Sequence, residues 1–142
     1  MPTVDEKINK RIPKIKRINS LLIKHFGIPK RQNPLPNPLD LLIATILSQN
    51  TNDNNSYKAF QNLKAKYNSW EELINEKRSV IEKHIRVAGL AKQKSDAIKN
   101  LINKLASEDE FNLKFILKMN DLEAIDVLTG YKGIGVKTAS CV

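Results

Sequence analysis

The sequence predicts an all-α protein, and three observations carry that prediction. No run of alternating polar and apolar residues is long enough for a β-strand. The five glycines and six prolines gather at the joints between segments with helical apolar spacing. Several of those segments open with a helix-capping pattern. At 142 residues the chain is long enough to bury a core without a disulfide or structural metal, and we expect seven or eight helices.

The first predicted helix runs from residue 13 to residue 26. Pro13 suits the first position of a helix, and Gly27 suits a left-handed stop after its end. Its apolar residues share one face: Ile15, Ile18, Leu22 and Phe26. Residues 28–38 carry four prolines and predict a linker. We therefore divide the chain into a basic N-terminal helix with its linker, residues 1–34, and a second domain, residues 35–142.

The second predicted helix begins with Asn37 as its cap and Pro38 just inside it. It continues to Gln49 and is apolar on nearly all sides, so we expect it to be the buried central helix. A third helix follows, for which Asp53 is the expected cap. Its predicted core residues are Ala59, Phe60, Leu63 and Tyr67.

Capping boxes mark the starts of three later helices. The pairs are Ser69 with Glu72, Ser79 with Glu82, and Asn120 with Glu123. Trp70 is interpreted as a hydrophobic anchor at the first of these starts. The helix that begins at Ser79 is expected to stop near Gly89, and another helix covers residues 91–105. The predicted inward residues of these two helices are Val80, Ile81, Ile85, Ala97, Ile98, Leu101 and Leu105.

Positive charge is concentrated near the N-terminus. The formal net charge is +9, and residues 1–34 hold nine basic side chains against Asp5 and Glu6. Such a segment attracts a polyanion such as DNA. The same pattern also fits a solvated, lysine-rich helix face. The longest apolar run, residues 41–47, is far shorter than the roughly 20 residues that a membrane span needs.

The strongest local motif is GYKGIGVKTA, residues 130–139. Gly133 and Gly135 flank one apolar residue, which lets the backbone turn tightly between two helices. Ile134 would anchor this turn in the core. The amides from Gly133 to Val136 would then lie uncovered at a helix N-terminus, where a phosphate binds by hydrogen bonds and the helix dipole.

Other glycine motifs fit this stretch less well. A P-loop requires lysine directly after its last glycine, but Val136 occupies that position and no strand precedes the motif. A dinucleotide-binding fingerprint fails because Thr138 stands where its third glycine would be. A plain joint between two helices also explains the two glycines.

LTGYKGIGVKTASCV resembles the helix-hairpin-helix of the endonuclease III superfamily of DNA glycosylases. NPLDLLIATILSQNTND resembles that family's early buried helix and the turn after it. IRVAGLAKQKSDAIKNLINKL resembles its glycine–leucine segment and the following helix. The three matches occur in order over residues 37–142. The resemblance implies the all-α helix-hairpin-helix glycosylase fold, here partial because the last helices are missing.

The resemblance also implies a reaction. Family members flip a damaged base out of the duplex and cleave its bond to the sugar. Members with lysine at the position of Lys137 use its amine as nucleophile at C1′, form a Schiff base and cleave the strand by elimination. A partly desolvated place in the first turn of a helix, whose dipole opposes positive charge, favours the neutral amine that this requires. Lys137 could instead be an exposed lysine or a phosphate contact.

The turn LSQNTND supplies the second group of candidate residues. In the family, this turn sends a polar side chain into the gap that the flipped base leaves. Asn50 occupies that position and Gln49 precedes it, so either could fill the gap, and we favour Asn50. Both could equally serve only as helix caps. Residues 92–94, Lys-Gln-Lys, could contact phosphate or be solvated surface.

Two groups implied by the resemblance lie outside this sequence. The family's essential aspartate would follow Val142, as would the cysteines of the iron–sulfur cluster that many members carry. Cys141 cannot replace four ligands, and we interpret it as a core residue. We therefore expect no cofactor and no metal site in this chain, which resembles the first two-thirds of a glycosylase.

These inferences predict an endonuclease III-like DNA glycosylase with abasic-site lyase activity in base excision repair, of which this chain is an inactive or weakened fragment. Its expected partner is double-stranded DNA with a damaged base or abasic site. We expect an intracellular monomer, cytoplasmic and nucleoid-associated or nuclear, without a membrane. Two alternatives remain: a non-catalytic DNA-binding helix-hairpin-helix module, and a helical fragment that associates through exposed apolar faces.

Overall fold

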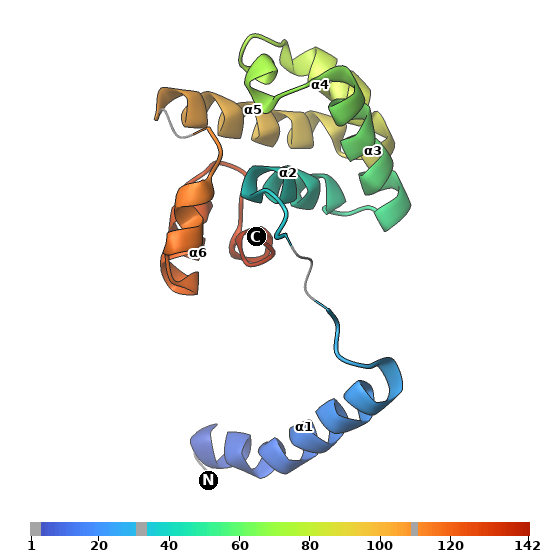
Figure 1. The fold of residues 1–142 in the computed structure, drawn as a ribbon, viewed down its shortest axis with the longest axis vertical. Coiled ribbons are helices and arrows are strands. Elements are labelled where there is room, and N and C mark those ends of the chain that lie inside the picture. The colour runs from blue at the N-terminus through green and yellow to red at the C-terminus, as the bar shows by residue number, and fades with distance from the viewer. Residues whose placement is uncertain (1–3, 31–33, 109–110) are drawn as a thin grey trace. The chain divides into compact units, whose positions relative to one another are not determined.

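A computed structural model describes residues 4–30, 34–108 and 111–142, and all regular structure in these ranges is helical. The all-α prediction is therefore confirmed. The chain divides into two compact units, residues 1–35 and 36–142. Figure 1 follows the helices in chain order. They are α1 (Val4–Phe26), α2 (Pro38–Ser48), α3 (Asp53–Lys66), α4 (Arg78–Ile85), α5 (Ala91–Ser107), α6 (Asp121–Thr129) and α7 (Val136–Ala139), with short 3₁₀ helices η1 (Trp70–Ile74), η2 (Arg86–Ala88) and η3 (Lys114–Lys118).

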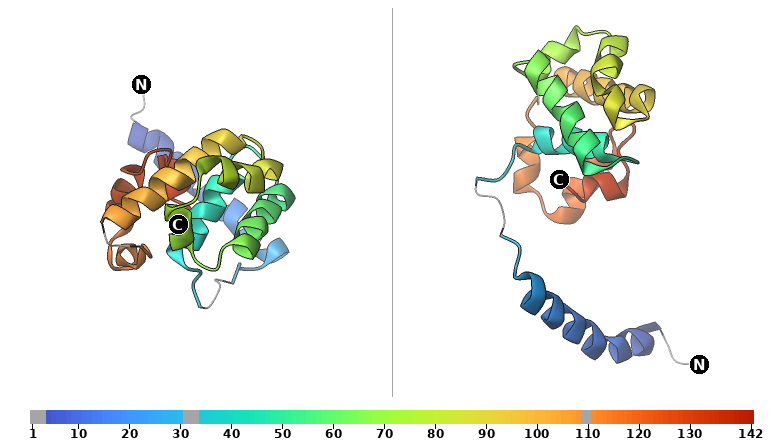
Figure 2. Two further views of the ribbon diagram at one scale, coloured as in Figure 1. Left: turned by 90° about the horizontal axis from the view of Figure 1, so that it is seen from above. Right: turned by 90° about the vertical axis from the view of Figure 1, so that its right-hand side faces the viewer.

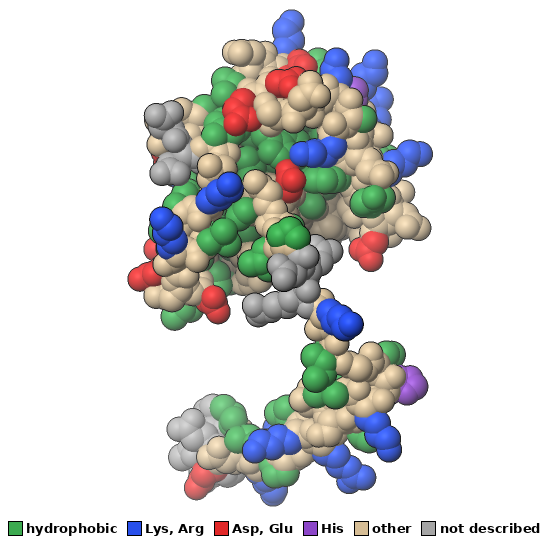
Figure 3. Space-filling model, in the orientation of Figure 1, with side chains coloured by type: hydrophobic (Ala, Val, Ile, Leu, Met, Phe, Trp, Pro, Cys, Tyr) green, Lys and Arg blue, Asp and Glu red, His purple; other side chains and the backbone are tan. Residues whose placement is uncertain are grey.

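The first unit is built on α1. The prediction that this helix starts at Pro13 is wrong, because it begins at Val4 and holds Pro13 in its interior. Ile8 and Ile12 extend the apolar stripe upstream, and the lysines and arginines around them are good helix formers, which offsets the hydrogen bond that proline removes. Gly27 ends the helix with φ +76°, as expected. The predicted apolar face is exposed within this unit, and Lys and Arg side chains lie along the helix in Figure 3.

The centre of the second unit is α2, as predicted. The Asn37 side chain accepts hydrogen bonds from the amides of Leu39 and Asp40 and so caps the helix. The helix contacts α3, α5 and α7, and Figure 2 shows it between these elements from two further directions. Burying an aliphatic side chain contributes about 1.5–3 kcal/mol. The buried apolar residues of α2 are Leu39, Leu42, Ile43, Ile46 and Leu47.

Helix α5 is the second organising element of this unit. It packs against α4, η1 and α2. All four of its predicted inward residues are buried: Ala97, Ile98, Leu101 and Leu105. Trp70 is buried as the expected anchor. Phe60 and Val80, both predicted to be core residues, are only half-buried.

The capping predictions have mixed outcomes. Asn120 and Glu123 form the expected reciprocal hydrogen bonds at the start of α6. Ser79 is not a cap, because α4 begins at Arg78 and the carboxylate of Glu82 accepts a hydrogen bond from that arginine. Asp53 is not the cap of α3 either. The Asn52 side chain accepts a hydrogen bond from the Asn55 amide and is the cap. Asp53 lies in the first turn, where its negative charge interacts favourably with the helix dipole.

Candidate functional site

The predicted hairpin is present between α6 and α7. Gly133 adopts φ +90°, a left-handed conformation that favours glycine. The amide of Ile134 donates to the carbonyl of Tyr131 at 3.1 Å and closes the turn. Ile134 is 5% exposed, so it anchors the loop in the core as the sequence predicts.

The outer side of the hairpin presents backbone to solvent. Gly135 is the N-cap of α7, and no side chain caps the helix there. The first-turn amides of a helix have no partner within it, so those of Val136 and Lys137 point beyond its end. The residues at the turn surface, Gly133, Gly135 and Val136, are exposed. This geometry leaves the backbone accessible to an anion.

The two hairpin glycines serve different needs. A Cβ atom on Gly133 would lie 2.9 Å from the Cβ of Ala97, so the hairpin and α5 approach each other too closely for a side chain. A Cβ atom on Gly135 would meet nothing within 4 Å. Gly133 is therefore required by packing, and Gly135 keeps the surface of the turn free.

Lys137 lies in the first turn of α7 beside a cavity of about 340 Å³. The expected partial desolvation is not found, because the lysine side chain is exposed: α7 turns this face outward and buries Thr138 and Ala139 instead. The same cavity is lined by Gln49, Asn50 and Thr138. The structure thus brings the two predicted groups of site residues together.

The turn after α2 distinguishes Gln49 from Asn50. The Gln49 side chain is half-buried and its Nε2 donates to the Thr138 hydroxyl at 2.9 Å, across 89 residues of sequence. Gln49 caps α2 only through its backbone amide. Asn50 is exposed, has φ +48° and caps neither helix. Asn50 is therefore the one with a side chain available for an incoming ligand.

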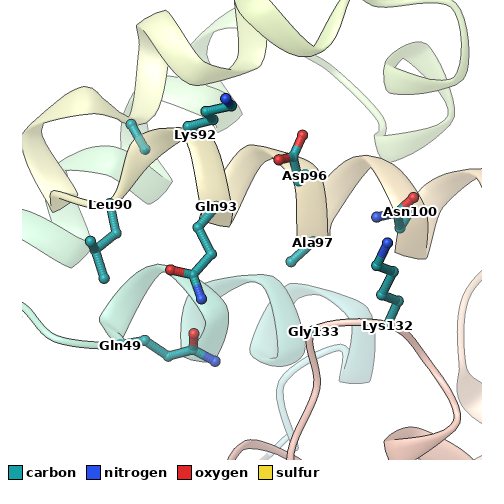
Figure 4. A pocket seen from close by; sticks show the side chains of 10 residues that line it. Gln49, Leu90, Lys92, Gln93, Asp96, Ala97, Asn100, Lys132 and Gly133 are labelled. Carbon is teal, nitrogen blue, oxygen red and sulfur yellow. The ribbon is translucent and has the colours of Figure 1, made fainter.

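A second cavity of about 840 Å³ adjoins this region and shares Gln49 with the first. Gln49 and Gln93 point toward one another from α2 and α5, and Lys132 extends from the hairpin toward Asn100 (Figure 4). Its other lining residues include Leu90, Lys92, Asp96 and Gly133. The wall combines apolar and polar side chains and carries charges of both signs.

Residues 92–94 differ in their exposure to solvent. Lys92 and Gln93 are exposed and line the larger cavity. Lys94 is 1% exposed, so it is neither the phosphate contact nor the solvated residue that the sequence suggested. Two backbone carbonyls accept hydrogen bonds from its ammonium group, which is why a lysine can be buried here.

Sequence reasoning missed Leu90 as a residue of this region. It is 49% exposed, has φ +46° and lines the larger cavity. A leucine after glycine gives no sign of this conformation; only its place in the glycine–leucine segment could have drawn attention to it. Thr138 was also missed, because its role depends on Gln49 from a distant helix.

Cys141 contradicts its predicted place in the core. It is exposed, with its Sγ donating to the Lys137 carbonyl at 3.3 Å, because the last turn of the chain directs it outward. Among the described residues, no three His, Cys, Asp or Glu side chains are grouped to hold a metal ion. One cysteine does not fit the ligand set of an iron–sulfur cluster. No helix within the described ranges combines the length and apolar character that crossing a bilayer requires.

Sequence comparisons identify relatives of the chain. The family model described as HhH-GPD superfamily base excision DNA repair protein matches residues 43–139. A protein of Arabidopsis thaliana named "Putative DNA glycosylase" is 40% identical over 105 residues, which are 73% of this chain and 36% of the relative. Endonuclease III of Thermotoga maritima is 29% identical over 125 residues, covering 85% of this chain and 52% of the relative.

A solved structure extends this similarity to the fold. The structure of a trapped endonuclease III–DNA covalent intermediate, an estranged-adenine complex, matches with a TM-score of 0.73 and 26% identity. The match covers 89% of this chain and 56% of that one. The chain therefore spans between about a third and somewhat more than half of the length of these relatives.

Proposed function

Because the chain belongs to the HhH-GPD superfamily of base excision DNA repair proteins, we propose that it supplies the reactive lysine of a DNA glycosylase with abasic-site lyase activity. One observation carries the proposal. Lys137 in α7 and Asn50 in the turn after α2, far apart in sequence, line the same cavity beside a hairpin with open amides. The trapped covalent DNA complex of the similar endonuclease III supports the same assignment.

The proposed reaction begins with a base flipped out of the duplex. The neutral amine of Lys137 attacks C1′ of deoxyribose, the new C–N bond replaces the bond to the base, and the base leaves with a proton. Opening of the sugar ring gives a Schiff base. Removal of a proton from C2′ then expels the 3′ phosphate and breaks the strand.

The other site residues hold DNA during this reaction. The amides from Gly133 to Val136 bind backbone phosphate, with Ile134 fixing the turn from below. Asn50 fills the space that the flipped base leaves, and the hydrogen bond from Gln49 to Thr138 ties the turn after α2 to α7. The partner is double-stranded DNA with a damaged base or abasic site, bound by a monomer.

The rate of this chain alone is expected to be low. No carboxylate is among the described residues that line the Lys137 cavity. A negative charge near C1′ stabilises the positive charge that develops on the sugar, and its absence slows the reaction. The test therefore uses a preformed abasic site, where Schiff base formation needs only addition of the amine to an aldehyde and loss of water.

Borohydride trapping tests the proposal. The chain is incubated with a duplex carrying one abasic site, and reduction converts the Schiff base to a stable amine. We expect a covalent adduct that falls by about 100-fold or more in Lys137→Arg, which keeps the charge but loses the nucleophile. Lys118→Ala, at another exposed lysine, is the matched control and should react as the unaltered chain does.

The same experiment separates the enzyme from the non-catalytic module. Binding to the abasic duplex without any adduct would favour a module that uses only the hairpin and basic residues. An adduct that persists in Lys137→Arg would place the nucleophile elsewhere and overturn the assignment. A chain that neither binds the duplex nor melts cooperatively would be an associating helical fragment.

A further inference from the structure

The buried lysine of α5 connects two turns that lie far apart in the sequence. Lys94 is 1% exposed. Its Nζ donates to the carbonyl of Leu47 at 2.8 Å and to the carbonyl of Ala88 at 2.7 Å. Leu47 lies in the last turn of α2, and Ala88 is the last residue of η2. One ammonium group therefore joins the ends of two helices.

Burying this charge is unfavourable in itself. Removal from water lowers the pKa of the Lys94 ammonium, because burial disfavours its charged form. A well-packed apolar residue often replaces a buried charge without loss of stability. The carbonyls at helix ends lack partners within their helices, and they satisfy the ammonium here. The role of Lys94 is thus to fix the separation between the end of α2 and the end of η2.

Each accepting carbonyl lies directly before a turn that contains left-handed backbone. The first turn, residues 48–51, contains Asn50 with φ +48°. The second turn, residues 89–91, contains Gly89 with φ +68° and Leu90 with φ +46°. Left-handed backbone is unfavourable for residues other than glycine and persists where surrounding contacts hold it. The larger cavity takes lining residues from both turns, Gln49 and Leu90.

From this geometry we infer that Lys94 is a positioning residue for the DNA site. It holds the first and second turns at the spacing in which both engage a damaged duplex, and it touches no DNA itself. The inference rests on the proposed function. On this inference, binding at a lesion uses both turns at once, whereas contact with undamaged phosphates through the hairpin uses neither.

Lys94→Met in the full chain tests this role, with Lys99→Met as the matched control. Lys99 also lies on α5, and its Nζ donates to the carbonyls of Leu73 and Ile74 at 2.7 Å each, away from both turns. Amide hydrogen exchange is followed by mass spectrometry, and affinity is measured for an abasic and an undamaged duplex of the same sequence. Lys94→Gln, which keeps one donor group, serves if the Met variant does not fold.

We expect Lys94→Met to speed exchange in both turns by about tenfold or more, the effect of losing hydrogen bonds from a charged donor. Its preference for the abasic over the undamaged duplex should fall by about tenfold, with unchanged affinity for the undamaged duplex. Lys94→Gln should show smaller changes in the same direction. Lys99→Met should loosen residues 73–76 and leave both turns and the preference unchanged.

Faster exchange in only one turn, or an equal loss of preference in Lys99→Met, would overturn the inference. Failure of the proposed function has a different signature, because the unaltered chain would then show no preference for the abasic duplex and no borohydride adduct. In that case the exchange data still decide whether Lys94 joins the two turns. Joint loosening supports the connection, and independent behaviour refutes it.

Discussion

The two ends of the second unit differ in whether their polar side chains are hydrogen-bonded within the fold or exposed to solvent. At the end formed by α3, η1, α4 and the first turn of α2, here called the paired end, polar groups bond to each other: the Trp70 indole donates to Asp40 at 2.6 Å, and the Tyr67 hydroxyl donates to Glu76 at 2.9 Å. At the end formed by α7 and the turn after α2, Lys137 and Asn50 are exposed. The hairpin amides that precede Lys137 are uncapped, and this end is here called the open end.

This difference separates residues that serve folding from residues available for chemistry. A polar group already bonded within the fold would have to break that bond before it could bind a ligand. Substitutions at the paired end should therefore reduce stability, and DNA affinity should fall only because less of the chain is folded. Substitutions of the exposed side chains at the open end should change binding or reaction without changing stability.

Gly133→Ala should have the largest effect on stability, and it tests whether the open end contains a folding residue. The new methyl group would lie 2.9 Å from the Ala97 Cβ, in a backbone with φ +90°. Steric crowding and backbone strain together should cost about 2–4 kcal/mol. The midpoint of urea denaturation would measure the loss.

Gly135→Ala is the contrasting variant in the same turn. Its methyl group meets nothing within 4 Å, so stability should change by no more than about 0.5 kcal/mol. DNA affinity should nevertheless fall by about tenfold, because the methyl group obstructs the approach of a phosphate to the backbone. Equal destabilisation by both alanines would refute the division of roles between the two glycines.

Asp40→Ala should have the next largest effect, at the paired end. The change leaves the buried Trp70 indole without its acceptor, and the expected cost is about 1–2 kcal/mol because the aspartate is one-third exposed. Asp53→Ala is the control, since Asp53 also lies in the first turn of a helix and no hydrogen bond to its carboxylate is seen in the described residues. Urea denaturation should show a clearly smaller loss for Asp53→Ala, and equal losses would assign the effect to the helix dipole.

The parts of this fold that the sequence predicts are those with local causes. The capping box of Asn120 and Glu123, the cap at Asn37 and the stop at Gly27 each depend on residues within a few positions. The hairpin likewise follows from the spacing of Gly133 and Gly135. The location of Lys137 in this turn was therefore predictable, although its chemical role remains a prediction.

The predictions that the structure contradicts concern residues whose environment depends on tertiary packing. A lysine is interpreted as a surface residue unless its partners are known, and the Leu47 carbonyl that accepts from Lys94 is 47 residues distant. Leu90 has a left-handed conformation that no neighbouring residue reveals. Cys141 was assigned to the core from its apolar neighbours, but the direction of a single helical turn exposes it.

Tyr67→Phe should have the smallest effect, and its pH dependence sharpens the contrast between the ends. Burial, followed by the hydrogen bond to Glu76, raises the pKa of Tyr67 above its usual value of 10.0. The amide of Lys77, followed by the Tyr67 hydroxyl, lowers the pKa of Glu76 below 4.5. At neutral pH the Phe variant should be about 0.5–1.5 kcal/mol less stable, because it lacks this hydrogen bond.

The difference in stability between the unaltered chain and Tyr67→Phe should be greatest between about pH 5 and pH 9. A raised tyrosine pKa gives stability that is present below pH 10 and lost as the pH rises beyond it. A lowered glutamate pKa gives stability that is present above pH 4.5 and lost as the pH falls, so the difference should narrow at both extremes. Urea midpoints from pH 3 to pH 11 measure this profile. A constant difference across that range would mean that the Tyr67–Glu76 pair does not couple folding to proton binding, and the paired end would then be stabilised by packing alone.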